Sequence, residues 1–288
     1  MSIRVHINGR VCLPEDAKIS VFDRGFLFGD SVYETIGTAY GRLFAANGHL
    51  VRLERSAQRI GLRVPTRAQM EEAIRDTVAA AGNPESRVRI ILTRGAGKLD
   101  LDPAAVDDTQ LVVIVWPLGG PTPAMYENGV TISIVSVTRN SPTAIDPAVK
   151  SGNYLNSVMA LGEARRRNGA YEAILCAADG SVAEGSSSNV FVVVTGEVRT
   201  PPIDVGILDG ITRGHILDLC REHQIPVAER RISPAELRAA DEVFITSAAR
   251  GVLPVIRVDE STTGDGKPGT TTRRLMSLYD QLARRGLD

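Results

Sequence analysis

The chain has 288 residues, of which 43% are hydrophobic and 23% charged, and its formal net charge is −1. This composition is typical of a globular protein that is long enough for two domains. The near-neutral charge argues against a nucleic-acid polyanion or an anionic membrane surface as partner.

The cysteines Cys12, Cys176 and Cys220 lie far apart in the sequence and form no CxxC pair. This spacing predicts neither a disulfide framework nor a zinc site, and no metal is expected. The first residues, MSIRVHINGR, lack the apolar region of a signal peptide, and no apolar run approaches a membrane span. We therefore expect a cytoplasmic protein.

Strand and helix patterns alternate along the first third of the chain. Asn8-Gly9 and Gly41-Arg42 are turn signals between extended apolar runs, which predicts two hairpins. Helical spacing of apolar residues follows, with Asn47 as the expected cap of the first helix and Gly82 as the end of the second. The predicted elements are strands at 4–7, 10–13, 31–40, 43–46, 88–93 and 111–116, and helices at 47–62 and 69–81.

The composition changes at PLGGPTPAMYENG, residues 117–129, which contains three prolines and three glycines. Such a segment is typical of an interdomain loop. The domain limits expected from it are 1–116 for a small N-terminal domain and 130–288 for a larger C-terminal domain. Mixed strands and helices in both parts predict an α/β or α+β architecture. The elements expected after the loop are strands at 130–137, 173–176, 190–194, 242–246 and 255–258, and helices at 154–167, 211–223 and 272–283.

Lys150, in VKSGNYLNSV, is one of four lysines in a chain with 29 arginines. It precedes the helix predicted from Tyr154, for which Asn153 is the expected cap. A lysine amine can form a Schiff base, whereas the guanidinium of arginine stays protonated. A position near a helix N-terminus, together with burial, would favour the reactive free amine. The alternative is an ordinary surface lysine.

Three other features have the chemistry to bind a phosphorylated carbonyl cofactor. LDGITR starts a helix at Ile211 and Thr212, and the free amides there would suit a phosphate. VAEGSSSNVF brings Glu184 and several hydroxyls to a strand end. Arg52 lies between Leu50 and Leu53 on an apolar helix face, where it either extends to solvent or faces a buried anion. Each feature also has a structural alternative: an ordinary helix start, a serine-rich loop or a snorkelling side chain.

Several segments in the same order resemble the fold-type IV pyridoxal-phosphate enzymes. These are the branched-chain aminotransferases, the D-amino-acid aminotransferases and aminodeoxychorismate lyase. The matching segments are FDRGFLFGDSVYET, GHLVRLERSA, KSGNYLNSV, EGSSSNVF, LDGITR and DEVFITSAARGVLPV. The resemblance implies a small N-terminal α/β domain, a larger C-terminal pseudo-barrel domain, a cleft between them and a homodimer.

The resemblance also implies roles for individual residues. Lys150 would bind pyridoxal 5′-phosphate covalently and move a proton between Cα and C4′. Glu184 would pair with the pyridine nitrogen, whose protonated ring acts as the electron sink. Tyr154 would contact the phenolic oxygen, although it follows the lysine by one residue fewer than in the branched-chain subgroup. The phosphate and the substrate carboxylate would be held by Arg52, Ile211, Thr212, Ser247, Ala248 and Ala249.

The substrate is harder to predict. The usual D-amino-acid pattern has a basic residue at the position of Gly37, and an Arg-x-His carboxylate trap where this chain has Leu99 and Leu101. A carboxylate in a dry cleft needs a counter-charge. Arg24 and Arg94 are therefore candidate substrate contacts near Tyr33, with Lys98 a third cation. Both arginines have a structural alternative, an ion pair with Asp23, Asp30 or Asp100.

These observations predict a transaminase that moves an amino group between an amino acid and a 2-oxo acid. Our first hypothesis is a non-standard D-amino-acid aminotransferase, with (R)-amines as a further substrate class. The alternatives are an L-branched-chain aminotransferase, a lyase of the aminodeoxychorismate type and a non-catalytic cofactor binder.

Overall fold

The computed structural model describes residues 2–106 and 108–286, which divide into two compact units. Unit 1 holds the chain up to Gly119, the short segment Val149–Asn153 and Gly286. Unit 2 holds Gly120–Ala148 and Tyr154–Arg285. The units differ from the expected domain limits most clearly at Val149–Asn153, which joins unit 1 because its main chain hydrogen-bonds to Ser31 and Tyr33.

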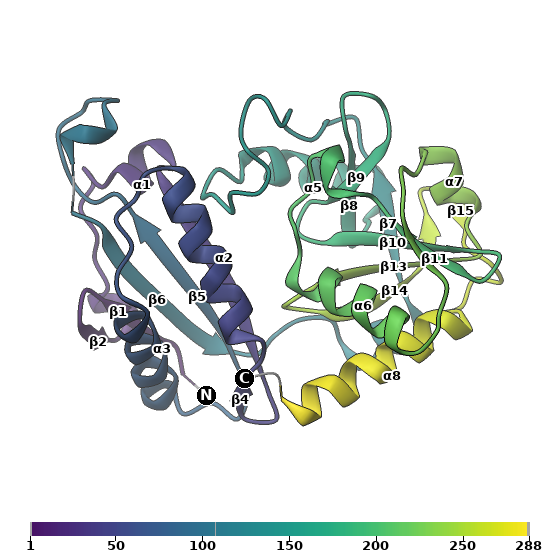
Figure 1. Cartoon of the computed structure of the whole chain (residues 1–288), viewed down its shortest axis with the longest axis horizontal. Helices are drawn as coiled ribbons and strands as arrows, with labels where there is room; N and C mark the ends of the chain where they lie inside the picture. The colour runs from purple at the N-terminus through teal and green to yellow at the C-terminus, as the bar shows by residue number, and fades with distance from the viewer. Residues whose placement is uncertain (1, 107, 287–288) are drawn as a thin grey trace. The chain divides into compact units, whose positions relative to one another are not determined.

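Unit 1 contains a six-stranded antiparallel sheet in the order β2-β1-β6-β5-β3-β4 (Figure 1). Its strands are β1 (Arg4–Ile7), β2 (Arg10–Cys12), β3 (Ser31–Ala39), β4 (Arg42–Leu43), β5 (Ser86–Thr93) and β6 (Gln110–Pro117). The hairpin at Asn8-Gly9 is confirmed, since both residues have the positive φ that such a turn requires, 46° and 89°. The second hairpin turns one residue earlier than expected, at Tyr40-Gly41.

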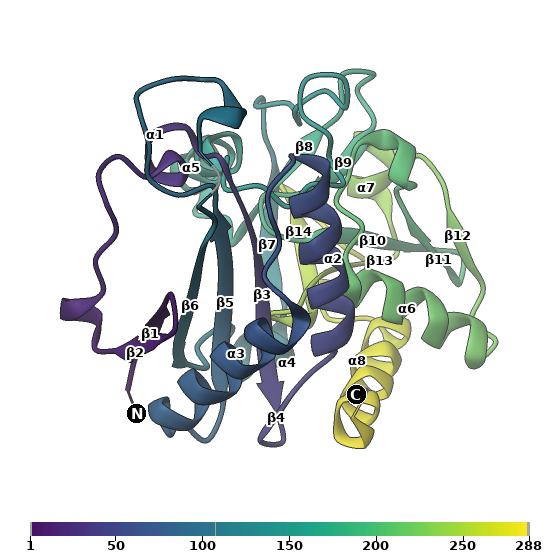
Figure 2. The same cartoon turned by 60° about the vertical axis from the view of Figure 1, so that its left-hand side comes forward.

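The helices of unit 1 are α1 (Arg24–Phe28), α2 (Ala46–Arg59) and α3 (Arg67–Ala81), with short 3₁₀ turns at Pro14–Asp16 and Pro103–Ala105. Helix α2 contacts β3, and α3 contacts β6 and β1 (Figure 2). Their apolar faces supply Leu50, Leu53 and Met70 to the core, each at most 2% exposed. The expected Asn47 cap is wrong: α2 begins at Ala46, so Asn47 lies inside its first turn.

Unit 2 contains a nine-stranded mixed sheet in the order β12-β11-β10-β13-β14-β7-β8-β9, with β15 paired to β14. Strand β9, at one end of this order, also contacts β10, so the sheet curls. The strands are β7 (Val130–Ile134), β8 (Glu172–Cys176), β9 (Val182–Gly185), β10 (Asn189–Val194), β11 (Glu197–Thr200), β12 (Val227–Glu229), β13 (Glu242–Ser247), β14 (Gly251–Val258) and β15 (Ser261–Thr262).

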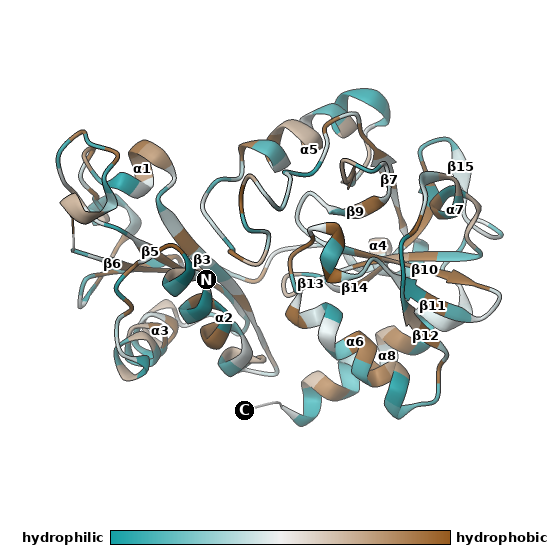
Figure 3. Cartoon of the chain, turned by 45° about the horizontal axis from the view of Figure 1, so that its top comes forward, coloured by the Kyte–Doolittle hydropathy of each residue, from teal (hydrophilic) through white to brown (hydrophobic). Residues whose placement is uncertain are grey.

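The helices of unit 2 are α4 (Pro123–Asn128), α5 (Leu155–Asn168), α6 (Ile211–Glu222), α7 (Pro234–Ala239) and α8 (Thr270–Arg285), with a 3₁₀ turn at Ile203–Val205. Helix α8 contacts α6, β13 and β14. Hydrophobic and hydrophilic residues alternate along α8 (Figure 3), as one-sided burial requires. Phe191 and Phe244 stack in the core beneath these helices, with ring centroids 4.8 Å apart.

Two local expectations for this part of the chain are wrong. The segment 117–129 is not a loop throughout, because Pro123 stands in the first turn of α4, where proline is tolerated, and Gly129 ends that helix. Asn153 does not cap α5, because its amide donates instead to the carbonyl of Gly29 in unit 1. Within residues 2–106 and 108–286, no helix combines the length and the apolar character that a membrane span requires.

Candidate active site

The main chain around Lys150 is fixed on two sides in unit 1. Its carbonyl accepts from the amide of Tyr33 at 2.9 Å, and its own amide donates to Ser56 Oγ of α2 at 3.2 Å. Gly152 lies so close to β3 that a Cβ there would stand 2.2 Å from Ser31 Oγ. The segment is therefore anchored to both β3 and α2, so the position from which the Lys150 side chain extends is well defined.

The Lys150 side chain lies beside Tyr33 and Arg89. Its Nζ stands 4.7 Å from the centroid of the Tyr33 ring, and Arg89 Cζ stands 3.7 Å from the same centroid. Tyr33 is buried and Arg89 is half-buried. Two cations over one ring are attracted to its π-electrons, and together they make this part of unit 1 favourable to an anion.

Arg89 differs from Arg52, Arg24 and Arg94 in that its guanidinium has no polar partner among the described residues. Among the described residues, its guanidinium forms no hydrogen bond and no ion pair, and the ring of Tyr33 is its only assigned contact. A planar, permanently charged fork in this state is suited to a carboxylate. Arg89 was not among the residues predicted from the sequence, although it interrupts the buried run of β5 between Val88 and Ile90.

Arg52 is buried, so the snorkelling alternative is wrong. It is 5% exposed and binds Glu34 through two hydrogen bonds, from Nε at 2.6 Å and from Nη2 at 2.9 Å. His49 Nδ1 lies 2.7 Å from the same carboxylate. Burial alone would raise the pKa of Glu34, but the charge of Arg52 and the contact with His49 lower it to about 2. Glu34 therefore stays ionised and fixes the direction of the Arg52 guanidinium.

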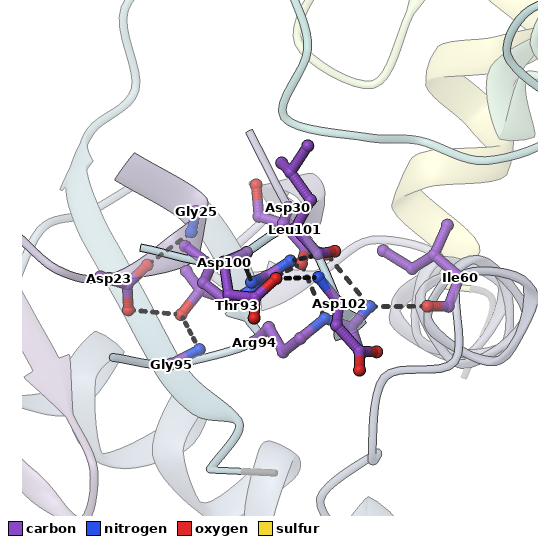
Figure 4. A network of polar contacts seen from close by, with 12 residues as sticks. Asp23, Gly25, Asp30, Ile60, Thr93, Arg94, Gly95, Asp100, Leu101 and Asp102 are labelled. Atoms are coloured by element: carbon purple, nitrogen blue, oxygen red, sulfur yellow. Dashed lines mark hydrogen bonds and ion pairs between the residues drawn. The ribbon is translucent and has the colours of Figure 1, made fainter. Parts of the chain in front are cut away.

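Arg24 and Arg94 form a separate cluster around Asp30. Figure 4 labels Arg94 and Asp30 of this cluster, with Ile60, Asp100 and Leu101 nearby. Arg94 donates twice to Asp30, at 2.7 and 3.1 Å, and also to the carbonyls of Ile60 and Gly61. Arg24 donates to Asp30 at 3.0 Å and to the carbonyls of Asp100 and Leu101. Burial would raise the pKa of Asp30, but hydrogen bonds from the two arginines hold it below its ordinary value.

This cluster favours the structural alternative for Arg24 and Arg94. Both are buried, at 3% and 6% exposure, and each spreads its donors over one carboxylate and two carbonyls. A substrate carboxylate would have to displace these bonds and leave buried groups without partners. At the two positions of the D-amino-acid carboxylate trap the chain has Leu99 and Leu101, whose side chains carry no charge and are 71% and 75% exposed.

In unit 2, Glu184 lies on β9 with its carboxylate held by three groups. Arg139 Nε stands 2.8 Å away, the amide of Leu208 donates at 3.0 Å and Asn189 Nδ2 at 3.4 Å. The Asn189 amide also donates to the carbonyl of Leu208 at 3.1 Å. The carboxylate is thus oriented within a mostly buried polar setting, at 8% exposure.

The same contacts bring Glu184 close to the start of α6. Gly210 is the N-cap of this helix, and a Cβ there would stand 2.0 Å from Asn189 Oδ1. The amides of Ile211 and Thr212 belong to the first turn, which has no intrahelical acceptors for them. Across the sheet, Asn189 pairs with Thr246. The sequence-predicted residues of the Glu184, Gly210 and Thr246 segments therefore meet at one end of the β10–β13 pair.

Hydroxyl groups without partners lie in this region. Thr246 Oγ1 and Ser247 Oγ are buried and have no hydrogen-bond partner in the described structure. Thr212 Oγ1 lies 3.3 Å from the hydroxyl of Tyr279, whose pKa burial raises to about 12. Ala248 and Ala249 form a turn that closes with a hydrogen bond from the Arg250 amide to the Ser247 carbonyl, at 3.0 Å.

The hydroxyl and amide groups at this end of the β10–β13 pair in unit 2 are suited to bind a phosphate ester. Buried orphan hydroxyls are rare because each one costs free energy unless a ligand or water satisfies it. Here they lie near a helix N-terminus, which attracts anions through its amides and its dipole. Tyr154 is half-buried at the N-cap of α5. The three serines after Glu184 are not part of this group, because they bind Glu172 instead.

Comparisons with known proteins give a consistent result. The family model for amino-transferase class IV matches residues 31–258. A putative branched-chain-amino-acid aminotransferase of Methanocaldococcus jannaschii is 35% identical over 97% of this chain and 96% of its own. A D-alanine aminotransferase of Bacillus licheniformis is 33% identical over 96% of this chain and 95% of its own.

The fold agrees with these relatives. The crystal structure of a branched-chain aminotransferase from the archaeon Thermoproteus uzoniensis, solved with norvaline, matches with a TM-score of 0.91. It is 32% identical, and the match covers 98% of this chain and 95% of that one. The two-domain α/β fold expected from the sequence is therefore confirmed. The chain belongs to the class IV aminotransferase family, and it is an aminotransferase of that family.

Proposed function

We propose that this aminotransferase uses pyridoxal 5′-phosphate and that Lys150 is the residue to which the cofactor is attached. When bound, this cofactor supplies an electron sink for the electrons released at the amino acid Cα. Lys150 supplies the amine that holds it and carries the proton between Cα and C4′. The observation that carries the proposal is the anchored Lys150 main chain, with Nζ 4.7 Å from the Tyr33 ring and Arg89 on the same ring.

A structural relative supports the choice of cofactor. A branched-chain amino acid aminotransferase crystallised with pyridoxamine 5′-phosphate matches this chain with a TM-score of 0.90. It is 31% identical, and the match covers 96% of this chain and 92% of that one. A cofactor of this kind needs an amine, a partner for the ring nitrogen and donors for a phosphate, and the chain offers residues of each type.

The remaining cofactor contacts follow from the chemistry of each group. Glu184, whose carboxylate is oriented by Arg139 and the Leu208 amide, would accept from the pyridine N–H. Arg52, oriented by Glu34, binds the phosphate. Further phosphate donors are the amides of Ile211 and Thr212, with the Thr212 and Ser247 hydroxyls. We also propose that Tyr154 contacts the phenolic oxygen, and that the amides of Ala248 and Ala249 bind phosphate or substrate carboxylate.

For the substrate, we propose that Arg89 and Tyr33 bind a carboxylate of glutamate and 2-oxoglutarate. Arg89 has no other polar partner among the described residues, whereas Arg24 and Arg94 are committed to Asp30. A buried carboxylate needs a counter-charge of this kind. One substrate pair would therefore be dicarboxylic. The other is an aliphatic amino acid and its 2-oxo acid.

We propose L-configured aliphatic amino acids as the first candidate substrates. Supporting this, the Thermoproteus uzoniensis enzyme and the Methanocaldococcus relative both have the branched-chain name. The carboxylate trap of the D-amino-acid pattern is also replaced by Leu99 and Leu101. The D-amino-acid hypothesis, which was our first from the sequence, becomes the second candidate. It keeps support because the D-alanine aminotransferase of Bacillus licheniformis is 33% identical, between the 32% and 35% of those two relatives.

A donor panel tests these alternatives. Purified protein loaded with pyridoxal phosphate would be assayed with L-leucine, D-alanine, L- and D-glutamate and (R)-phenylethylamine, against 2-oxoglutarate and pyruvate. We expect L-leucine with 2-oxoglutarate to be the fastest pair. If only D-amino acids or (R)-amines react, the stereochemical proposal is wrong. Pyruvate release from aminodeoxychorismate without an amino acceptor would indicate a lyase.

We also propose a cytoplasmic homodimer. Large apolar side chains are exposed in and beside α1 of unit 1, among them Val21 at 64% and Phe26 at 66%. Exposed apolar groups clustered in this way mark an interaction surface, and a second copy of the chain would bury them. The three cysteines are free thiols, as a reducing compartment allows. Light scattering of Phe26→Ser against wild type tests the dimer: an unchanged mass would refute this surface.

A further inference from the structure

Glu172 is a buried carboxylate that the proposed chemistry does not use. It stands at the start of β8 with 0% exposure. All three serines that follow Gly185 donate to it: Ser186, Ser187 at 2.9 Å and Ser188 at 3.1 Å. The amide of Ala173 also donates, at 3.1 Å. A fully buried charge is tolerated only with such complete satisfaction.

The charged partner of Glu172 is Arg250. Its Nη1 stands 3.0 Å from the carboxylate, and its Nη2 donates to Ser187 Oγ at 2.9 Å. Its Nε donates to the hydroxyl of Tyr171 at 3.1 Å, and the guanidinium lies 5.3 Å from the Tyr171 ring centroid. Each nitrogen of the guanidinium is thus fixed by a different neighbour.

The main chain of Arg250 is fixed as well. Its amide closes the turn onto the Ser247 carbonyl at 3.0 Å, and its carbonyl accepts from the Tyr126 hydroxyl at 2.7 Å. Arg250 is therefore the last residue of the turn that contains Ser247, Ala248 and Ala249. Glu172 joins this turn to the loop after Glu184, since both segments bind the one carboxylate.

We infer that Arg250, held by Glu172, is a positioning residue that fixes the direction of the Ser247–Arg250 turn amides toward a bound anion. The inference rests on the proposed role of that turn. Amides bind an anion well only if they are oriented before it arrives, because a turn that must be ordered on binding loses affinity. The planar guanidinium of Arg250, which donates to Glu172, Ser187 and Tyr171, can fix the orientation of the turn, whereas the ammonium group of a lysine could not.

The decisive variants separate charge from geometry. In Arg250→Lys a positive charge stays near Glu172, so the melting temperature should change little. The contacts to Tyr171 and Ser187 are lost, so the KM for the amino acid should rise about tenfold with a smaller change in kcat. Arg250→Met should show the same rise in KM together with a lower melting temperature. Arg257→Met, at an exposed arginine of β14, the strand that follows Arg250, is the matched control and should change neither.

The double variant Glu172→Gln/Arg250→Met removes the buried charge along with its partner. We expect it to recover melting temperature relative to Arg250→Met while the KM stays high. If the double variant restores both, or if Arg250→Lys has the wild-type KM, the role of Arg250 is only structural and the inference is wrong. If the absorbance spectrum shows that wild-type protein binds no pyridoxal phosphate, the proposed function is wrong and the inference with it. If wild type forms a normal holoenzyme but the Arg250 variants keep the wild-type KM, only the inference is wrong.

Discussion

The buried pair Arg24 and Arg94 and the half-buried Arg89, all in unit 1, differ in the polar partners of their guanidinium groups. Around Asp30, Arg24 and Arg94 donate to a shared carboxylate and to four main-chain carbonyls (Figure 4). Beside Tyr33, the guanidinium of Arg89 lies against an aromatic ring and has no polar partner among the described residues. The charges of Arg24 and Arg94 are thus neutralised by a carboxylate, whereas the charge of Arg89 has no such counter-charge among the described residues. The hydrogen-bond and ion-pair partners of the guanidinium, rather than the residue type, therefore distinguish a structural arginine from a candidate ligand-binding one.

The largest effect expected from this comparison is on stability. Arg94→Met removes four donated hydrogen bonds and leaves Asp30 with one of its two arginines. Breaking a buried ion pair in this way costs about 3–5 kcal/mol of unfolding free energy. Urea unfolding of the holoenzyme measures it. The KM for 2-oxoglutarate should stay near the wild-type value in whatever fraction remains folded, and a selective rise in KM would mean that Arg94 binds substrate after all.

The next effect concerns Glu34 and depends on pH. Its pKa is lowered from 4.5 to about 2 in the folded protein, so the carboxylate stabilises the fold fully above pH 4.5. This contribution, about 3 kcal/mol, is lost as the pH falls toward 2. Unfolding free energies of wild type and Glu34→Gln should therefore converge in acid.

The matched control for this titration is Glu54→Gln. Glu54 pairs with Arg67, and both side chains are 27–30% exposed. Its removal should change stability by less than about 1 kcal/mol at any pH. A constant gap between wild type and Glu34→Gln from pH 2 to 7 would contradict the lowered pKa of Glu34.

The smallest effect is on substrate binding and belongs to Arg89. Arg89→Met should raise the KM for 2-oxoglutarate about tenfold, which corresponds to about 1.4 kcal/mol, the scale of one charge-assisted hydrogen bond. The KM for pyruvate, which has no second carboxylate, should rise less. Stability should remain nearly unchanged, the reverse of Arg94→Met. Equal KM increases for both oxo acids would place Arg89 outside the dicarboxylate contact.

The sequence was most informative where function depends on local motifs. Lys150, the Gly210-Ile211-Thr212 helix start and Glu184 could be named as candidates from the sequence, since each lies in a short contiguous segment. Strand and helix periodicity likewise predicted most elements of both sheets. The residues that orient these groups were harder to find. Glu34 and Arg52 are 18 positions apart, and Arg94 and Asp30 are 64 positions apart.

Two of the missed features share one physical cause, which is competition from distant partners. Asn153 has the side chain of a good helix cap, but the Gly29 carbonyl binds it across 124 positions. The serines after Gly185 suggested ligand hydroxyls, yet buried Glu172 recruits all three. Arg89 was missed for a different reason. Its lack of a polar partner becomes visible only when its surroundings are known.

Chemical trapping tests most directly whether Lys150 is the residue to which the cofactor is attached. Holoenzyme loaded with pyridoxal phosphate would be reduced with borohydride, digested and mapped by mass spectrometry. Lys150→Ala and Lys98→Ala, a lysine of the same unit, would serve as the paired controls. We predict a pyridoxyl adduct on the peptide containing Lys150 in wild type and Lys98→Ala, and neither adduct nor transamination in Lys150→Ala. An adduct on another lysine, or full activity of Lys150→Ala, would contradict the account.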